Sequence, residues 1–250
     1  MLFKHTSKFY EPQKHIIDFY EMLINSGNHS LIAGTTGSGK SVLLNNCLNY
    51  MLSNYSPKDF NLILFDPKIV ELSRYKNIKH CLYYENNIIQ MNNIMRGLIE
   101  TMNKRYKIMD RNGLTLYPGK KIIIVIDELA DLLTAYKDES KKFCNYLQIL
   151  LAKSRAARIN FVICTQAPRR DIISGKLLIN IPTRAALRCS TQIESRQIIN
   201  VSGAENLPKY GHCLLLSPDL TQIKEYSFGM DNPTNNIKNW EKGGKFIIKW

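Results

Sequence analysis

Residues 34–41 have the spacing G-x-x-x-x-G-K-S, which is typical of a loop that holds the phosphates of a nucleotide. Its glycines allow backbone angles that a side chain would block, so successive N–H groups can point inward at an anion. Lys40 would reach the β- and γ-phosphates of ATP, and the Ser41 hydroxyl would ligate Mg²⁺. A glycine-rich turn that matches by chance is the alternative. The residues expected around the phosphates are Gly34, Thr35, Thr36, Gly37, Ser38, Gly39, Lys40, Ser41 and Val42.

Further polar residues follow two aliphatic runs. Asp127 would hold Mg²⁺ directly or through water, and Glu128 would orient or deprotonate the attacking water. An ordinary acidic pair between a strand and a loop is the alternative, and the phosphate loop upstream argues against it. Thr165 and Gln166 would lie beside the γ-phosphate and could report its loss; taken alone, Thr165 is better explained as a helix cap. Together these residues predict hydrolysis of ATP.

Short apolar runs and segments with helical periodicity alternate along the chain. We expect strands at 31–33, 62–65, 122–126, 161–164, 185–189 and 213–216, and helices at 11–25, 40–52, 88–109 and 141–157. This alternation is typical of an α/β fold with a mostly parallel sheet and helices on both faces. Such sheets bind ligands at the carboxyl ends of their strands, where the polar residues named above would therefore lie.

Composition narrows the class of protein. The chain has 250 residues and a net charge of +13, which favours an anionic partner such as nucleic acid, with a basic protein that lacks one as an equal alternative. Six cysteines without a C-x-x-C pair or zinc spacing fit a reducing cytosol. No signal peptide is recognisable, and no apolar run has the roughly 18–20 residues of a membrane helix. We therefore expect a cytoplasmic protein that reaches a membrane only through a partner.

In this order, several segments resemble the FtsK/SpoIIIE family of DNA translocases. The resemblance is far more specific than a phosphate loop alone, and it spans roughly residues 29–228. We therefore expect a helical extension at 1–28, a motor domain at 29–228 and a tail at 229–250. The segments that carry the resemblance are 31–42, 64–72, 125–132, 153–160, 163–168, 180–184, 194–198, 203–207 and 210–211.

The resemblance implies a RecA-like P-loop domain that assembles into a homo-hexameric ring and uses ATP and Mg²⁺ to move double-stranded DNA through a central pore. It assigns the phosphate and metal roles to Lys40 and Ser41, and the metal and water roles to Asp127 and Glu128. The segment at 66–68 also matches the family, at a strand end near the nucleotide, without an expected catalytic role.

Arg155 matches an arginine that would reach the γ-phosphate of a neighbouring subunit and supply positive charge in the transition state. Arg158 and Arg188 are the alternatives for that role. From the residues alone, Arg155 would be a solvated helix residue. The resemblance therefore adds a catalytic arginine that the spacing of residues does not indicate.

The segment 168–176 lies where the family places a DNA-facing loop. Arg169, Arg170 and Lys176 would contact backbone phosphates there, which gives affinity for any DNA sequence. An ordinary basic surface loop is the alternative. Gln192 is neutral where another basic pore residue would be expected, and this departs from the family pattern.

The long members of the family carry membrane helices, a linker and a winged-helix domain, and no segment here fits them. We therefore expect a minimal motor of a phage, plasmid or other mobile element that transfers, segregates or packages DNA, docked on a membrane or portal partner. An ATPase that powers protein secretion is one alternative, although such chains usually carry tandem ATPase domains. A nucleotide-binding module without motor action is another, and the presence of Lys40, Asp127 and Glu128 argues against it.

Overall fold

A single sheet runs through the molecule. The structure, a computed structural model, describes residues 12–134, 137–166 and 172–229. The strands are β1 (Ser30–Ala33), β2 (Phe60–Phe65), β3 (Cys81–Glu85), β4 (Lys121–Ile126), β5 (Ile159–Thr165), β6 (Thr183–Leu187), β7 (His212–Leu216) and β8 (Lys224–Ser227). They are ordered β3-β2-β4-β5-β1-β6-β7-β8. Strands β3 to β6 in this order pair in parallel, and β7 and β8 add antiparallel pairs at one side.

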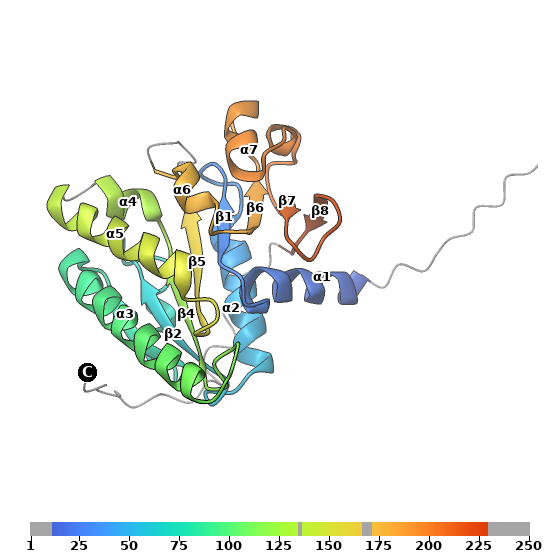
Figure 1. Ribbon diagram of the computed structural model, residues 1–250. Helices are drawn as coiled ribbons and strands as arrows, with labels where there is room; N and C mark the ends of the chain where they lie inside the picture. The colour runs from blue at the N-terminus through green and yellow to red at the C-terminus, as the bar shows by residue number, and fades with distance from the viewer. Residues whose placement is uncertain (1–11, 135–136, 167–171, 230–250) are drawn as a thin grey trace, which may run out of the picture.

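Helices cover both faces of this sheet (Figure 1). The π-helical turn η1 continues α1 directly, and α2 begins at the last residues of the phosphate loop. Helices α3, α4 and α5 lie together on the opposite face from α2. The helices are α1 (Pro12–Tyr20), η1 (Glu21–Asn25), α2 (Lys40–Asn54), η2 (Ser73–Tyr75), α3 (Ile88–Arg111), α4 (Leu129–Thr134), α5 (Lys137–Lys153), α6 (Gly175–Leu178), α7 (Gln192–Ile199) and η3 (Ala204–Asn206).

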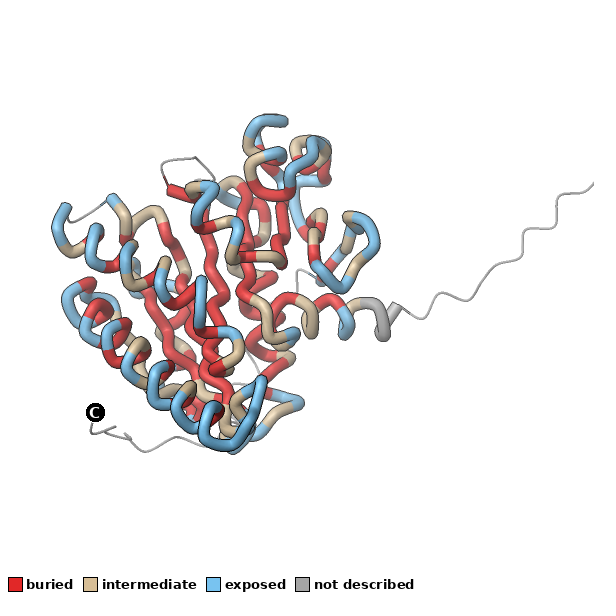
Figure 2. Tube along the Cα trace, in the orientation of Figure 1, coloured by how far each residue is buried: buried red, intermediate tan, exposed pale blue. Residues whose placement is uncertain are grey.

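Alternation along the strands divides the core into two layers. In β4, Ile124 and Ile126 pack under α3 and α5, whereas Ile123 and Val125 pack under α2. Successive side chains of a strand point to opposite faces, so a strand covered on both faces must be apolar throughout. Figure 2 shows this pattern, with the central strands buried and the outer sides of the helices exposed. The expected RecA-like α/β fold, mostly parallel with helices on both faces, is confirmed.

Some expected boundaries were wrong. The helix expected at 141–157 is α5, which ends at Lys153. Beyond it the chain turns back towards β5, with the Ser154 hydroxyl donating to the Ile159 carbonyl at 2.7 Å and Arg158 in a left-handed backbone conformation with φ 54°. The sequence reasoning also missed β3, β8, α4, α6 and α7. Helix α7 did have a signal, because Thr191 and Glu194 form a capping box at its start.

Strand β8 forms one border of the sheet. It is short and largely exposed, and within the part of the chain that the structure describes it pairs with β7 alone. Its charged residues Lys224 and Glu225 face solvent, and Glu225 contacts the His212 ring with 3.1 Å between Oε1 and Nδ1. The sheet therefore ends in a charged strand on this side.

All six cysteines are free thiols. Cys164 and Cys213 are buried, as expected of small apolar residues, and burial raises the pKa of both thiols well above the usual value. Among the described residues, none of the helices is long and apolar enough to cross a bilayer.

Candidate nucleotide site

The expected site residues meet at one edge of the sheet, which we call the carboxyl edge because β1, β4 and β5 end there. The phosphate loop, residues 34–41, connects β1 to α2. Asp127 directly follows β4, and Thr165 is the last residue of β5. Strands β4, β5 and β1 are consecutive neighbours in the sheet, so the three segments lie together.

Three glycines of the phosphate loop are required for different reasons. Gly37 and Gly39 have φ values of 75° and 99°, a left-handed region that L side chains rarely adopt. A Cβ at Gly34 would lie 2.8 Å from the Leu187 Cβ and 3.1 Å from the Arg188 carbonyl oxygen. The loop therefore needs backbone freedom at two positions and close packing against the end of β6 at the third.

Lys40 lies against the loop that it would serve. Its side chain is 8% exposed, and its Nζ donates to the carbonyls of Gly34 at 2.8 Å and Thr35 at 3.0 Å. Burial lowers the pKa of Lys40, and the nearby carboxylates of Glu128 and Asp127 act in the opposite direction. The ammonium thus stands next to the loop amides, where the positive end of α2 also favours an anion.

The Asp127 carboxyl has the electrostatics of a metal ligand. Burial, together with the carboxylates of Asp66, Glu71 and Glu128, raises the pKa of Asp127 to about 7. The negative charges of these carboxylates disfavour ionisation of Asp127, and a divalent cation would offset that effect. The partly buried Ser41, in the first turn of α2, supplies the hydroxyl expected of a Mg²⁺ site. These donors therefore fit the metal that the phosphate loop implies.

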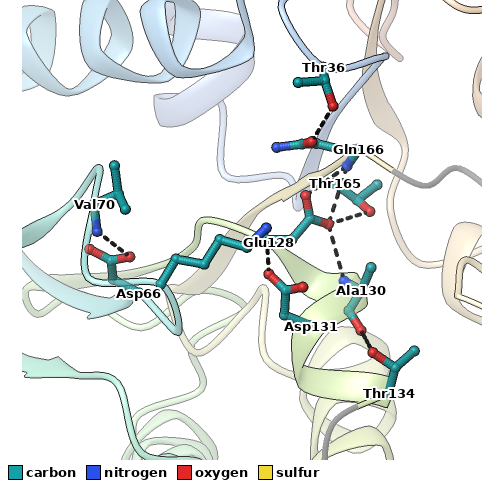
Figure 3. Close-up of polar contacts among 10 residues, drawn as sticks. Thr36, Asp66, Val70, Glu128, Ala130, Asp131, Thr134, Thr165 and Gln166 are labelled. Atoms are coloured by element: carbon teal, nitrogen blue, oxygen red, sulfur yellow. Dashed lines mark hydrogen bonds and ion pairs between the residues drawn. The ribbon is translucent and has the colours of Figure 1, made fainter.

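Glu128 is held between two elements (Figure 3). It is 3% exposed, and its carboxylate accepts from the Thr165 hydroxyl at 2.8 Å, the Gln166 N–H at 2.9 Å and the Ala130 N–H at 3.2 Å. The Gln166 side chain in turn accepts from the Thr36 hydroxyl at 2.6 Å. A continuous set of hydrogen bonds therefore joins the phosphate loop to Glu128, and Thr165 is part of it at the end of a strand.

Sequence reasoning left Asp66 without a role, and the structure places it beside the site. Its buried carboxylate accepts from the N–H groups of Val70 at 3.2 Å and Leu72 at 3.0 Å. This closes a turn in which Ile69 has φ 59°. The turn also carries Lys68, whose Nζ lies 3.0 Å from the Asp131 carboxylate on α4. The signal available in the sequence was an acidic residue followed by proline at the end of a buried strand.

With this geometry in hand, the chain can be compared with known proteins. The family model described as FtsK/SpoIIIE matches residues 7–116. The chain is 38% identical over 201 residues to the DNA translocase FtsK of Clostridium acetobutylicum, with 74% of this chain and 26% of that protein covered. It is 33% identical over 257 residues to the DNA translocase FtsK of Vibrio parahaemolyticus, with 87% and 25% covered. The chain belongs to the FtsK/SpoIIIE family.

Solved structures share the fold of this chain. The pCW3 conjugation coupling protein TcpA, solved with ATPγS, superposes with a TM-score of 0.73 at 26% identity, covering 85% of this chain and 64% of that one. The type VII secretion ATPase EccC of Thermomonospora curvata superposes with a TM-score of 0.65 at 21% identity, covering 80% and 25%, and shares the fold. The chain spans about a quarter of the length of the FtsK relatives cited above.

The arginine that the family resemblance singled out lies elsewhere. Arg155 is exposed in the turn between α5 and β5, at the opposite end of the strands, which we call the amino edge. Its Nη1 donates to Asn28 Oδ1 at 3.3 Å, just before β1. The alternative Arg158 lies in the same turn and donates to the Gly119 carbonyl at 3.3 Å. Neither arginine therefore belongs to the nucleotide site of its own chain.

The other alternative, Arg188, lies at the carboxyl edge. It follows β6 with an exposed side chain, and its carbonyl accepts from both the N–H and the hydroxyl of Thr35. Of the residues expected to contact DNA, Lys176 is exposed on α6, near the same edge. Arg169 and Arg170 lie outside the described residues.

Proposed function

We propose that this chain is an ATP-driven translocase of double-stranded DNA. The observation that carries the proposal is the placement of Glu128, a buried carboxylate at the end of β4 that Thr165, Gln166 and Thr36 connect to the phosphate loop. A carboxylate in that place serves to activate water, which binding alone does not require. The FtsK relatives, named as DNA translocases, support DNA as the substrate.

The residues at the carboxyl edge divide the work of hydrolysis. Lys40 would turn its ammonium from the carbonyls of Gly34 and Thr35 to the β- and γ-phosphates. Ser41 and Asp127 would hold Mg²⁺, which when bound neutralises charge that develops on the phosphate oxygens. Glu128 would accept the proton of the attacking water. Thr165 and Gln166 hold that carboxylate in place through three of its hydrogen bonds.

The position of Arg155 supports assembly. A residue at the amino edge can serve a nucleotide at the carboxyl edge only in another copy, so the two copies must meet head to tail. Head-to-tail contacts that close on themselves produce rings. We propose a homo-hexameric ring in which the Arg155 side chain of each copy reaches the γ-phosphate held by the next, and supplies charge in the transition state.

DNA would pass through the pore of that ring. The net charge of +13 suits a polyanion, and contacts to phosphates give grip without reading sequence. The exposed Lys176 is a candidate for such a contact, together with Arg169 and Arg170. The secretion alternative is supported by likeness in fold alone, at 21% identity to EccC.

We further propose that residues 29–228 are the motor unit, with 1–28 as a helical extension and 229–250 as a tail. The buried Phe19, Leu23 and Ile24 support an extension that packs on the motor, since they join the core beneath α2. The free thiols suit a cytoplasmic protein. A membrane or portal partner would then determine where the motor docks.

The experiment that tests the function measures steady-state ATP hydrolysis with and without long linear duplex DNA, at low and moderate salt. Strong stimulation by duplex that weakens as salt rises is the expected result, because phosphate contacts release counterions. Glu128→Gln is the control, since it should bind ATP and DNA without turnover. Hydrolysis of equal rate with and without DNA would contradict the proposal.

A further inference from the structure

We propose that Arg105 of α3 is a positioning residue for Arg155. This inference rests on the proposed function, in which Arg155 acts on the nucleotide of a neighbouring copy. Arg155 lies in the turn at 154–158, and a catalytic side chain on a turn is useful only if that turn is held still. Arg105 restrains this turn by donating hydrogen bonds to two of the turn's backbone carbonyls.

The contacts of Arg105 converge on this turn. Its side chain is buried, with 9% exposed, and Nη1 donates to the Ala157 carbonyl at 2.7 Å and to the Arg158 carbonyl at 3.4 Å. Its guanidinium also lies 4.5 Å from the centre of the Tyr117 ring. The Tyr117 N–H donates to the Ala156 carbonyl at 2.9 Å. Three consecutive carbonyls of the turn therefore receive donors from Arg105 and from the residue that it stacks on.

Neighbouring contacts complete the restraint. The hydroxyl of Tyr106, the next residue of α3, donates to the Lys153 carbonyl at the end of α5. Within the turn, the Arg158 N–H donates to the Arg155 carbonyl at 2.9 Å, and the Ser154 hydroxyl donates to the Ile159 carbonyl at 2.7 Å. The backbone on both sides of Arg155 is thus fixed, while its side chain remains exposed.

The chemistry of Arg105 favours a role beyond simple stability. Its partners are carbonyl oxygens and an aromatic ring, so its buried positive charge meets dipoles. Burying a charge without a carboxylate partner costs more free energy than packing an apolar residue in the same place. The planar guanidinium lies over the Tyr117 ring while its Nη1 donates to two carbonyls, and the compact ammonium of lysine would reproduce this arrangement less well. This arrangement fixes the backbone of the turn that carries Arg155.

The test uses mixed assemblies of the full chain on duplex DNA. Arg105→Met should keep ATP binding, measured with a fluorescent ATP analogue, and lose about 10²-fold in hydrolysis, as a displaced catalytic group does. Adding Glu128→Gln chains, which have an intact Arg155 and an inactive site of their own, should restore hydrolysis at the Arg105→Met sites. Arg96→Met, an exposed arginine on the same helix, should keep the unmodified rate.

Arg155→Ala mixed with Glu128→Gln is the reference. If the reference is restored and Arg105→Met is not, the loss lies in the variant's own site and the positioning role is overturned. An unmodified rate for Arg105→Met also overturns it. If the reference is not restored, action between copies fails, and this inference fails with it while DNA-stimulated hydrolysis stands. If Arg105→Met unfolds below the assay temperature, Arg105→Lys replaces it in the same mixing experiments, and the same results support or overturn the proposal.

Discussion

The two ends of the same strands are built in opposite ways. At the carboxyl edge, burial disfavours the charged forms of Asp127 and Lys40. A cation beside Asp127 and an anion beside Lys40 would stabilise those charged forms, so ligand binding is favoured there. At the amino edge, the turn that carries Arg155 has its carbonyls satisfied by Arg105 and Tyr117. The carboxyl edge is suited to binding a charged ligand that is later released, whereas the amino edge fixes the backbone that carries Arg155.

The phosphate loop and the Arg155 turn also differ in how they can be recognised from the sequence. The phosphate loop is contiguous, and the hydrogen bonds of Lys40 stay within it. The Arg155 turn instead depends on Asn28, Arg105 and Tyr117, which come from three other parts of the chain. The first is therefore a local motif that can be recognised in isolation, whereas the second exists only once the fold has formed.

The largest expected effect separates the two edges directly. Arg155→Ala should reduce duplex-stimulated hydrolysis about 10³-fold, because the transition state loses a positive charge, while ATP binding is unchanged. Lys153→Ala, an exposed neighbour at the end of α5, should leave both quantities unchanged. Turnover and equilibrium binding of an ATP analogue are the measurements. A loss of ATP affinity in Arg155→Ala would mean that the amino edge serves its own chain.

The next effect concerns the carboxyl edge alone. Glu128→Gln should lower turnover about 10²-fold or more with ATP bound, because the amide accepts no proton from water. Thr165→Val should cost about tenfold, because it removes one donor to the carboxylate and leaves the Gln166 N–H in place. Single-turnover hydrolysis measures both losses. If Thr165→Val lost as much turnover as Glu128→Gln, the hydrogen bond from Thr165 would be as important to hydrolysis as the carboxylate itself, contrary to this expectation.

A steric change should test how tightly the phosphate loop packs. Gly34→Ala places a Cβ against Leu187 and the Arg188 carbonyl, and overpacking of this kind costs about 1–3 kcal/mol. We expect a Tm lower by roughly 3–10 °C, with weaker ATP binding. Gly175→Ala is the matched control, since open space surrounds its Cβ. An unchanged melting curve for Gly34→Ala would mean that the loop yields readily.

The smallest expected effect is a pH dependence at Asp127, whose pKa of about 7 exceeds its usual value. Between the two values the folded chain binds a proton that the unfolded chain lacks, so this group makes the metal-free protein less stable as pH rises towards 7. Mg²⁺ requires the carboxylate, and its affinity should fall up to about tenfold per unit below pH 7. Mg²⁺ titrations of ATP hydrolysis at several pH values measure this. If the Mg²⁺ concentration at half-maximal hydrolysis were the same below and above pH 7, this expectation would be wrong.

The sequence predicted most of the sheet and the nucleotide loop for a physical reason. The apolar run around Ile124 and the spacing before Lys40 are local patterns that backbone geometry alone constrains. Asp66 escaped assignment because its effect on Asp127 depends on β2 lying beside β4 in the sheet, although the strands are far apart in sequence. Arg105 escaped for the same reason, since the carbonyls of Ala157 and Arg158 to which it donates follow it by more than fifty residues. The role of Arg155 came from the family resemblance and stays a prediction.

Strand β8 has a consequence for how copies of this chain can meet. An unpaired strand border is a template on which another chain can add a strand, and such growth leads to aggregation. Lys224 and Glu225 stand exposed on a short border strand, which disfavours that addition. In the proposed ring, where several copies would lie close together, these charges would disfavour pairing of β8 with a strand of another copy and so protect the protein from aggregation.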